Sequence, residues 1–369
     1  MSEELRCIGC GSILQDQDPK KSGYLPTSAL KKALTSDDNE VYCQRCFRLR
    51  HYNEIMPVEE NNDDFLALLN SISQKKALVV NVVDLFDFSN SLISSIKRFI
   101  GGNEYILVGN KVDLFPKNSK ELKIKDWMRQ EANRNGLKPE KIFLVSAAKK
   151  KNLADLMAFL AKKGEKKDIY FVGTTNVGKS TLINAIINMN SDLKDVITTS
   201  KFPGTTLDEI KIPLSNGHYL IDTPGILNAN QLASHLSGKE LEVVEPKKPL
   251  KPATYQLLPG QTIFLAGLGR FDYVDGPSAG FTIYVARDLY VHRTKTENAD
   301  TFYEKHKDDL LLPPSKEDNL GPLKGQTFSP KERSDILFGG VGFITTPANV
   351  VVKAYTPEGI GLGIRRALI

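Results

Sequence analysis

Residues 173–181 read Gly-Thr-Thr-Asn-Val-Gly-Lys-Ser-Thr, with the G-x-x-x-x-G-K-[ST] spacing of a loop that binds nucleotide phosphates. Backbone N–H groups and the N-terminus of a following helix can hold the phosphate oxygens. Lys179 can pair with the β- and γ-phosphates, and the Ser180 hydroxyl can bind Mg²⁺. The predicted phosphate-binding residues are Gly173, Thr174, Thr175, Asn176, Val177, Gly178, Lys179, Ser180 and Thr181.

A second phosphate element follows at Asp222-Thr-Pro-Gly225, where a predicted strand ends. The carboxylate of Asp222 can hold Mg²⁺ through water, and Gly225 leaves its N–H facing the γ-phosphate. The polar loop between the two elements reads Phe-Pro-Gly-Thr-Thr at 202–206. Its Thr206 is the predicted second protein ligand to magnesium, with Thr205 as the alternative. The predicted magnesium ligands are therefore Ser180, Thr206 and Asp222. The predicted catalytic residues are Asn176, Lys179, Thr206 and Gly225.

Residues 110–113, Asn-Lys-Val-Asp, have the pattern of a guanine-binding motif. The carboxylate of Asp113 can accept hydrogen bonds from guanine N1–H and its exocyclic amine, whereas adenine has no donors there. The motif alone is a weak signal, but it directly follows a predicted buried strand. One strand later, Ser-Ala-Ala at 146–148 can close over the base. The elements together predict GTP and GDP as ligands, with Asn110, Lys111, Asp113, Ser146, Ala147 and Ala148 around the guanine.

The guanine motif precedes the phosphate loop, which is the reverse of the order in a linear GTPase. Doubly wound sheets bind ligands at the carboxyl ends of their strands, so strand position matters and chain order does not. The termini of domains often lie close together, and the polar segment 162–168 can join two former ends. The sequence thus predicts an α/β fold: a circularly permuted Ras-like P-loop GTPase domain with a mainly parallel sheet and helices on both faces.

The elements that must position these motifs are short apolar strands with helices between them. Strands are predicted at 77–84, 105–109, 141–145, 168–172 and 219–222, and helices at 89–100, 118–135, 152–162 and 181–187. After about residue 230 the alternation is lost, and a β-rich α+β domain is predicted. Its strands are expected at 262–266, 281–286, 289–293 and 349–353, with a helix at 300–310. The predicted domains are 1–60, 61–229 and 230–369.

All four cysteines lie in two C-x-x-C pairs, Cys7/Cys10 and Cys43/Cys46. Two such pairs can present four thiolates to a structural Zn²⁺, which leaves no open position for catalysis. Disulfides or a redox motif are the alternatives, and a reducing cytosol disfavours disulfides. The stretch between the pairs is predicted to be a long loop closed by the metal. The basic segment 47–52 after them could touch RNA phosphate or could simply be solvated.

Composition limits the class of protein. Over 369 residues, 41% are hydrophobic and 25% charged, as in ordinary globular proteins. The net charge of +5 tolerates an anionic partner such as RNA without requiring one. No run of about 18 apolar residues is found, so no membrane partner is expected. We expect a cytoplasmic protein, with a monomer favoured.

The order of these motifs behind a four-cysteine module resembles the circularly permuted GTPases, and among them the bacterial YqeH family. The stretch Val83-Asp-Leu-Phe-Asp-Phe-Ser89 also resembles that family's first strand. The resemblance implies a GTPase that assists assembly of the small (30S) ribosomal subunit through ribosomal RNA or a ribosomal protein, with an RNA-binding C-terminal domain. The candidate RNA-contacting residues are Arg270, Tyr273, Tyr290, Arg293, Lys295, Arg365 and Arg366; without the resemblance, scattered surface charge is the favoured interpretation.

Hydrolysis is expected to be slow without a partner. Ras-like enzymes orient water with a Gln after the Asp-x-x-Gly glycine, and here that residue is Ile226. Asn176 resembles the Asn with which related GTPases coordinate K⁺, but it could equally serve only the loop backbone. The element at 222–225 leads directly into the C-terminal region, so its state could bias that region.

Three other functions remain possible on the sequence. One is a P-loop enzyme that transfers phosphate to a small molecule, although no acceptor-binding acid or basic lid is evident. Another is a redox or nitric-oxide-linked enzyme that uses the cysteines, which saturation by zinc would disfavour. The third is a GTPase that regulates a non-ribosomal RNA or protein.

Overall fold

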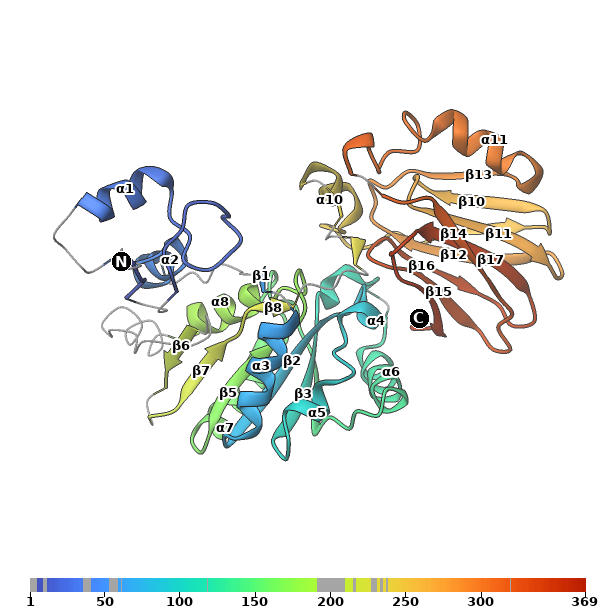
Figure 1. Cartoon of the computed structure of the whole chain (residues 1–369). Coiled ribbons are helices and arrows are strands. Elements are labelled where there is room, and N and C mark those ends of the chain that lie inside the picture. Colours follow the sequence, from blue (N-terminus) through green and yellow to red (C-terminus); the bar gives the residue numbers. More distant parts are fainter. Residues whose placement is uncertain are drawn as a thin grey trace. The chain divides into compact units, whose positions relative to one another are not determined.

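The computed structural model describes residues 5–8, 12–35, 41–52, 59–60, 62–117, 119–190, 210–214, 217–226, 231–232, 235–236, 238–318 and 320–369. The chain forms two compact units (Figure 1). The first comprises residues 1–112 and 125–227, and the second comprises residues 113–124 and 228–369. Within the described ranges, no helix combines the length and apolar character needed to cross a membrane.

The first unit is built on a six-stranded sheet with the order β4-β3-β2-β5-β7-β6. Its strands are β2 (Ala77–Asp84), β3 (Glu104–Asn110), β4 (Lys141–Leu144), β5 (Asp168–Val172), β6 (Ile210–Pro213) and β7 (Tyr219–Asp222). All neighbouring pairs are parallel except β6 with β7, which are antiparallel. The predicted mainly parallel sheet is confirmed.

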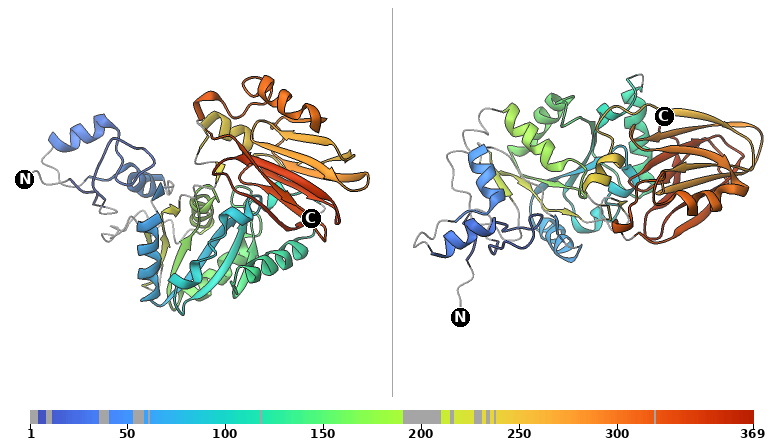
Figure 2. Two further views of the ribbon diagram at one scale, coloured as in Figure 1. Left: turned by 45° about the vertical axis from the view of Figure 1, so that its right-hand side comes forward. Right: turned by 90° about the horizontal axis from the view of Figure 1, so that it is seen from above.

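Helices cover both faces of this sheet, since every residue of its central strand β2 is buried. One face packs its alternate residues, among them Leu78, Val80 and Phe171, against helices α7 (Leu153–Gly164) and α8 (Lys179–Met189). The other face meets α3 (Asn62–Ser73), which lies across the sheet from α7 and α8 in the views of Figure 2. The helix α6 (Glu121–Arg134) completes the cover, and its Trp127 packs edge-on against Phe88.

The prediction of one continuous helix at 89–100 is wrong. The structure has two short helices, α4 (Phe88–Ser91) and α5 (Ile96–Phe99), separated by an extended Leu92. The Ser91 hydroxyl is the physical reason: it bonds back to the carbonyl of Phe88 and also accepts the N–H of Asp84. A serine that bonds to nearby backbone competes with continuation of a helix.

The cysteine-rich segment contains helices where a long loop was predicted. Helix α1 (Thr27–Thr35) lies between the cysteine pairs, and Leu30 on it packs against Cys7, Cys43 and Cys46. Helix α2 (Gln44–Tyr52) begins directly after Cys43. Its Leu49 is 1% exposed and belongs to the hydrophobic core of the six-stranded sheet. Burial of these leucines explains why the helices form.

The second unit is a sandwich of two five-stranded antiparallel sheets, with orders β13-β10-β11-β17-β14 and β18-β15-β16-β12-β9. The first consists of β10 (Gln261–Leu265), β11 (Gly269–Asp275), β13 (Val291–Lys295), β14 (Leu323–Phe328) and β17 (Val351–Pro357). The second consists of β9 (Ala253–Leu257), β12 (Ala279–Val285), β15 (Ser334–Phe338), β16 (Gly342–Thr346) and β18 (Leu362–Arg366). Apolar side chains of both sheets form one core, which includes Phe271, Phe281 and Ile344.

The predicted β-rich domain is confirmed, but six of the ten strands in its two sheets were not predicted. The strands β9, β11, β14, β15, β16 and β18 are short and interrupted by polar residues. The helix predicted at 300–310 is α11 (Thr296–His306), which starts four residues earlier. The remaining elements are α10 (Gly238–Val244), the two-residue strands β1 (Glu59–Glu60) and β8 (Gly225–Ile226), and the 3-10 turns η1 (Val112–Leu114) and η3 (Lys316–Asp318).

Candidate functional site

The predicted nucleotide motifs meet at one edge of the six-stranded sheet. The register pairs Asp84 with Asn110 across β2 and β3, and Phe171 with Asp222 across β5 and β7. β2 and β3 end together, and β5 and β7 end together opposite Asn81 and Val80 of β2. The phosphate loop, the guanine motif and the Asp-Thr-Pro-Gly element lie at these carboxyl ends of the strands. Chain order is reversed while strand position is kept, as the permuted fold requires.

The two glycines of the phosphate loop are sterically required. Gly178 has φ +81°, and a Cβ built on it would lie 2.5 Å from the side-chain amide nitrogen of Asn110. A Cβ on Gly173 would lie 2.8 Å from the carbonyl oxygen of Val82. The loop therefore packs closely against both β2 and the guanine motif. Asn176, at its exposed tip, also has a positive φ of +62°.

Asn110 ties the phosphate loop to the predicted guanine loop. Its side-chain amide donates to the carbonyl of Val177 at 2.9 Å, and its side-chain oxygen accepts the N–H of Ala147 at 3.0 Å. The residue is 2% exposed. Because both ends of this amide are bonded to backbone, Asn110 acts here by holding two loops in register. It was predicted as a nucleotide-binding residue, and this geometry gives it a positioning role.

The remaining guanine-motif residues have different surroundings. Lys111 has φ +67°, and its ammonium lies 2.6 Å from a carboxylate oxygen of Asp84. Asp113 is half-buried at η1, Ser146 and Ala147 are buried, and Ala148 is exposed. The prediction missed Asp84 as a partner of Lys111, although its place at the end of a buried strand was a usable signal.

Lys179 and Asp222 form a buried ion pair, and the Lys179 ammonium also donates to the carbonyl of Thr223. The exposed fraction is 6% for Lys179 and 0% for Asp222. Burial lowers the pKa of the Lys179 ammonium and nearby Arg45 lowers it further, against the opposing charge of Asp222. The structure thus brings together the predicted phosphate-binding lysine and the predicted magnesium-binding aspartate.

Arg45 is the functional candidate that the sequence did not reveal. It lies on α2 inside the second cysteine pair, yet its guanidinium nitrogen is 2.9 Å from a carboxylate oxygen of Asp222. Arg45 is 5% exposed. The two residues are 177 positions apart, so no local sequence pattern could have paired them.

The Asp-Thr-Pro-Gly element is bonded directly to the phosphate loop. The N–H of Thr175 donates to Ile226, and the N–H of Ile226 donates to Gly173, at 2.8 and 3.1 Å. A Cβ on Gly225 would come within 3.3 Å of Thr175. Backbone hydrogen bonds therefore join the two loops directly.

The other predicted phosphate and magnesium residues differ in their surroundings. Thr174 is buried in the phosphate loop, Ser180 is buried in the first turn of α8, and Thr181 is exposed on α8. The predicted ligands Thr205 and Thr206 lie outside the described residues.

Three of the four predicted zinc ligands come together. The sulfurs of Cys7, Cys43 and Cys46 all lie within 4.8 Å of one another, and all three residues are buried. A tetrahedral site with Zn–S bonds of about 2.3 Å places its sulfurs about 3.8 Å apart, so this spacing fits zinc. The N–H of Cys43 donates to the sulfur of Cys7 at 3.2 Å, which favours a thiolate. Cys10 lies outside the described residues.

The RNA-contacting set predicted in the C-terminal region does not form one surface. Arg270 is paired with Asp272 and Arg365 with Asp335, at 2.8 and 3.3 Å, and both arginines are buried. Tyr273 is a core residue with 0% exposure. Tyr290, Arg293, Lys295 and Arg366 are exposed. The predicted set is divided because alternating residues of a strand point to opposite faces of the sheet. The buried arginines need carboxylate partners, which are present beside them.

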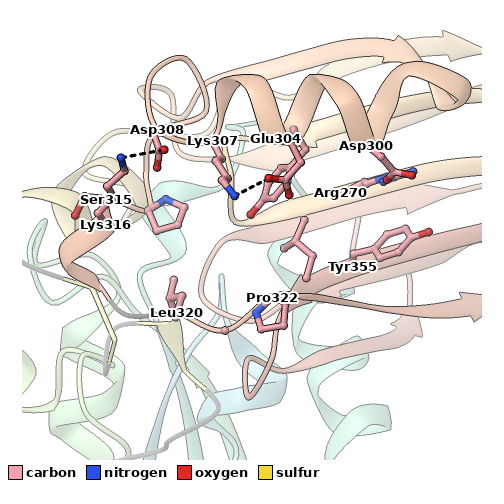
Figure 3. Close-up of a pocket in the computed structure, with 14 residues that line it drawn as sticks. Arg270, Asp300, Glu304, Lys307, Asp308, Ser315, Lys316, Leu320, Pro322 and Tyr355 are labelled. Atoms are coloured by element: carbon pink, nitrogen blue, oxygen red, sulfur yellow. Dashed lines mark hydrogen bonds and ion pairs between the residues drawn. The ribbon is translucent and has the colours of Figure 1, made fainter.

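The second unit also contains a cavity of about 570 Å³ between α11 and the β14–β17 edge of one sheet (Figure 3). Its wall includes the ion pairs Lys307–Glu304 and Lys316–Asp308, at 2.6 and 3.2 Å. Arg270, which lies over the Tyr355 ring, is paired with Asp272 and Asp300. Because these cations are already matched by carboxylates, the cavity does not single out an anionic ligand.

Comparisons with known proteins agree with the motifs. Residues 168–250 match the family described as "50S ribosome-binding GTPase", and residues 278–368 match the family described as "YqeH-like, C-terminal". Over 371 residues the chain is 47% identical to YqeH of Bacillus subtilis (strain 168), described as uncharacterized, and the match covers 100% of both chains.

A more distant relative and a solved structure are also similar. NO-associated protein 1, chloroplastic/mitochondrial, of Arabidopsis thaliana is 29% identical over 387 residues, covering 92% of this chain and 69% of that protein. The GDP-bound structure of TM YlqF is 23% identical, with a TM-score of 0.30, and the match covers 49% of this chain and 64% of that one.

Substitution of Gly178 by alanine tests the close packing of the phosphate loop. We expect Gly178→Ala to weaken binding of a fluorescent GDP analogue at least tenfold, because the new methyl group collides with the Asn110 amide that aligns the loop. Gly217→Ala is the matched control: it has a similar φ of +82°, but its Cβ meets nothing within 4 Å. Both variants bear a backbone cost of about 1 kcal/mol from the positive φ. Equal affinities for the two variants, measured by titration, would contradict the packing argument.

Proposed function

The chain belongs to the YqeH family and is a GTPase, and from that membership we propose that it assists assembly of the small (30S) ribosomal subunit in the cytoplasm. The partner is ribosomal RNA or a ribosomal protein. The observation that supports the nucleotide part is the meeting of guanine and phosphate motifs at one sheet edge. The ribosomal part rests on the family resemblance, and the matching GTPase family is itself described by binding to the 50S subunit.

In this proposal, different residues bind the triphosphate, the guanine base and Mg²⁺. Lys179 and the backbone N–H groups of the phosphate loop hold the triphosphate, and Asp113 selects guanine. Mg²⁺ is held by Ser180, Asp222 and, outside the described residues, Thr206, and it neutralises charge on the β- and γ-phosphates. The N–H of Gly225 faces the γ-phosphate. We assign these roles from residue type and from position at the sheet edge.

Turnover is slow in this proposal, because Ile226 can neither orient nor deprotonate water. Asn176 has a position at the exposed tip of the phosphate loop that suits a K⁺ ligand. Potassium would then supply positive charge near the transferring phosphate. Hydrolysis faster in KCl than in NaCl supports this role, and equal rates contradict it.

The cysteine module holds a structural zinc ion in this proposal. Three buried sulfurs within mutual reach support it, with Cys10 as the fourth ligand. The expected zinc content is one ion per chain, measured by atomic absorption. Substitution of Cys43 by serine is expected to remove the ion.

We further propose that the nucleotide state reaches the C-terminal region through the Asp-Thr-Pro-Gly element. Gly225 is hydrogen-bonded into the phosphate loop through the adjacent Ile226, and the chain then continues toward residue 230. The domains in this scheme are 1–60, 61–229 and 230–369. Identical hydrogen exchange of residues 230–369 with GTP and with GDP would contradict this coupling.

Base selection by Asp113 is tested with the variant Asp113→Asn. The amide offers a donor where guanine also offers donors, so GTP use is expected to fall on the order of 10²-fold or more. Xanthosine triphosphate, which has a carbonyl in place of the amine, is expected to become the better substrate. Steady-state hydrolysis of the two nucleotides measures the effect. Asp126→Asn, an exposed aspartate on α6, is the control and should keep the preference for GTP. An unchanged preference in Asp113→Asn would remove Asp113 from the base site.

The ribosomal role is tested by sedimentation of cell extract that contains the tagged protein. With a non-hydrolysable GTP analogue we expect co-migration with the small subunit, and with GDP we expect release. The variant Gly178→Ala, which is expected to bind nucleotide poorly, should not respond to the analogue. Absence from ribosomal fractions with every nucleotide would contradict the proposal and favour a non-ribosomal partner. Co-migration with the large subunit would instead match the description of the related family.

A further inference from the structure

Arg45 brings a third charged group to the edge of the six-stranded sheet where the phosphate loop lies. It comes from the cysteine-rich segment of the chain. The guanidinium lies 2.9 Å from one carboxylate oxygen of Asp222, while the other carboxylate oxygen is paired with Lys179. All three groups are buried, with exposed fractions of 5%, 0% and 6% for Arg45, Asp222 and Lys179. Arg45 belongs neither to the guanine motif nor to the phosphate loop, so those motifs do not explain why it lies here.

Two cations share one carboxylate at this point, since Arg45 and Lys179 both pair with Asp222. Buried charge is stable only when it is paired. Two cations beside a phosphate loop suit a polyanion such as a nucleoside triphosphate.

Binding of Mg²⁺ by Asp222 would change the partner of Arg45. The carboxylate would then bind the metal in place of the two cations. Lys179 would have the phosphate oxygens beside it in the loop. The guanidinium of Arg45 would either move away with its helix or stay where a phosphate oxygen can replace the carboxylate.

The packing of α2 favours the second alternative. Leu49, one turn after Arg45, is 1% exposed and belongs to the core beneath the six-stranded sheet. Moving α2 outward would expose that leucine and leave a gap in the core, which is unfavourable. Rotation of a long side chain is the smaller change. Arg45 therefore stays at the edge of the sheet when its carboxylate partner is taken by the metal.

We propose that Arg45 is a phosphate-binding residue supplied in cis by the cysteine module, which pairs with Asp222 in the arrangement described here and with a phosphate oxygen of GTP when Asp222 holds Mg²⁺. Arginine is well suited to this exchange because its planar guanidinium binds carboxylate and phosphate alike. The inference rests on the proposed magnesium role of Asp222 and is independent of any ribosomal partner. It also gives the enzyme a positive group at the phosphates although Ile226 stands in place of the water-orienting residue.

The test uses the full-length zinc-loaded protein and the variants Arg45→Gln and Arg45→Ala. Glutamine keeps an N–H donor for Asp222 and removes the charge. Single-turnover GTP hydrolysis is expected to fall at least tenfold in both variants, as for the loss of a charged group that contacts the transferring phosphate. Binding of fluorescent GDP is expected to change less than threefold. Aluminium fluoride, which mimics the transferring phosphate, should tighten GDP binding to the wild-type protein and should not do so in either variant.

Arg48→Gln is the matched control, one turn further along the same helix, and is expected to behave as the wild type. Zinc content and thermal unfolding of each variant show whether the fold is kept. Wild-type hydrolysis and a wild-type response to aluminium fluoride in Arg45→Gln would overturn the proposal. An equal loss of affinity for GDP and for a GTP analogue, together with a loss of zinc or of stability, would also overturn it, because that pattern belongs to a structural ion pair.

Discussion

The edge of the six-stranded sheet where the predicted nucleotide motifs meet depends on the carboxylate of Asp222. A fully buried carboxylate must be paired, and here it is paired twice, with Lys179 of the phosphate loop and with Arg45 of the cysteine module. One charge therefore holds together three segments that are distant in the sequence. The same carboxylate is the one that Mg²⁺ would claim, so the arrangement of the three segments is linked to the ligand. Under the proposed magnesium role of Asp222, structural pairing and metal binding would compete for this one carboxylate.

Backbone geometry supports this edge independently of charge. The strand register brings the ends of β2 and β3 together and the ends of β5 and β7 together on the same side of the sheet. Asn110 joins the loop after β5 to the loop after β4 by hydrogen bonds. None of these contacts depends on which strand comes first in the chain. A permuted order is tolerated because neighbouring parallel strands are fixed by hydrogen bonds and side-chain packing. The permutation changes only which segment of the chain follows each loop.

The second unit shows why charge in a sequence is a poor guide to a binding surface. Arg270 and Arg365 are buried on the sheet faces that point away from the core of the sandwich, each beside an aspartate on the same sheet. Their aliphatic stems and guanidinium planes pack over the rings of Tyr355 and Phe343. These arginines stabilise the fold of the unit. The exposed residues Tyr290, Arg293, Lys295 and Arg366 are what remains of the predicted set.

The sequence by itself determined the nucleotide chemistry, the permuted parallel sheet and the β-rich character of the second unit. Motif spacing and strand periodicity are local properties, and residues such as Lys179, Asp222 and Gly178 are recognisable from their neighbours in the chain. Only the tertiary structure decided that Arg45 meets Asp222, that Lys111 meets Asp84, and that Arg270 is buried. These contacts join residues on different elements or depend on which face of a strand is covered. No pattern within one segment encodes them, because side-chain pairing is settled by how the elements pack.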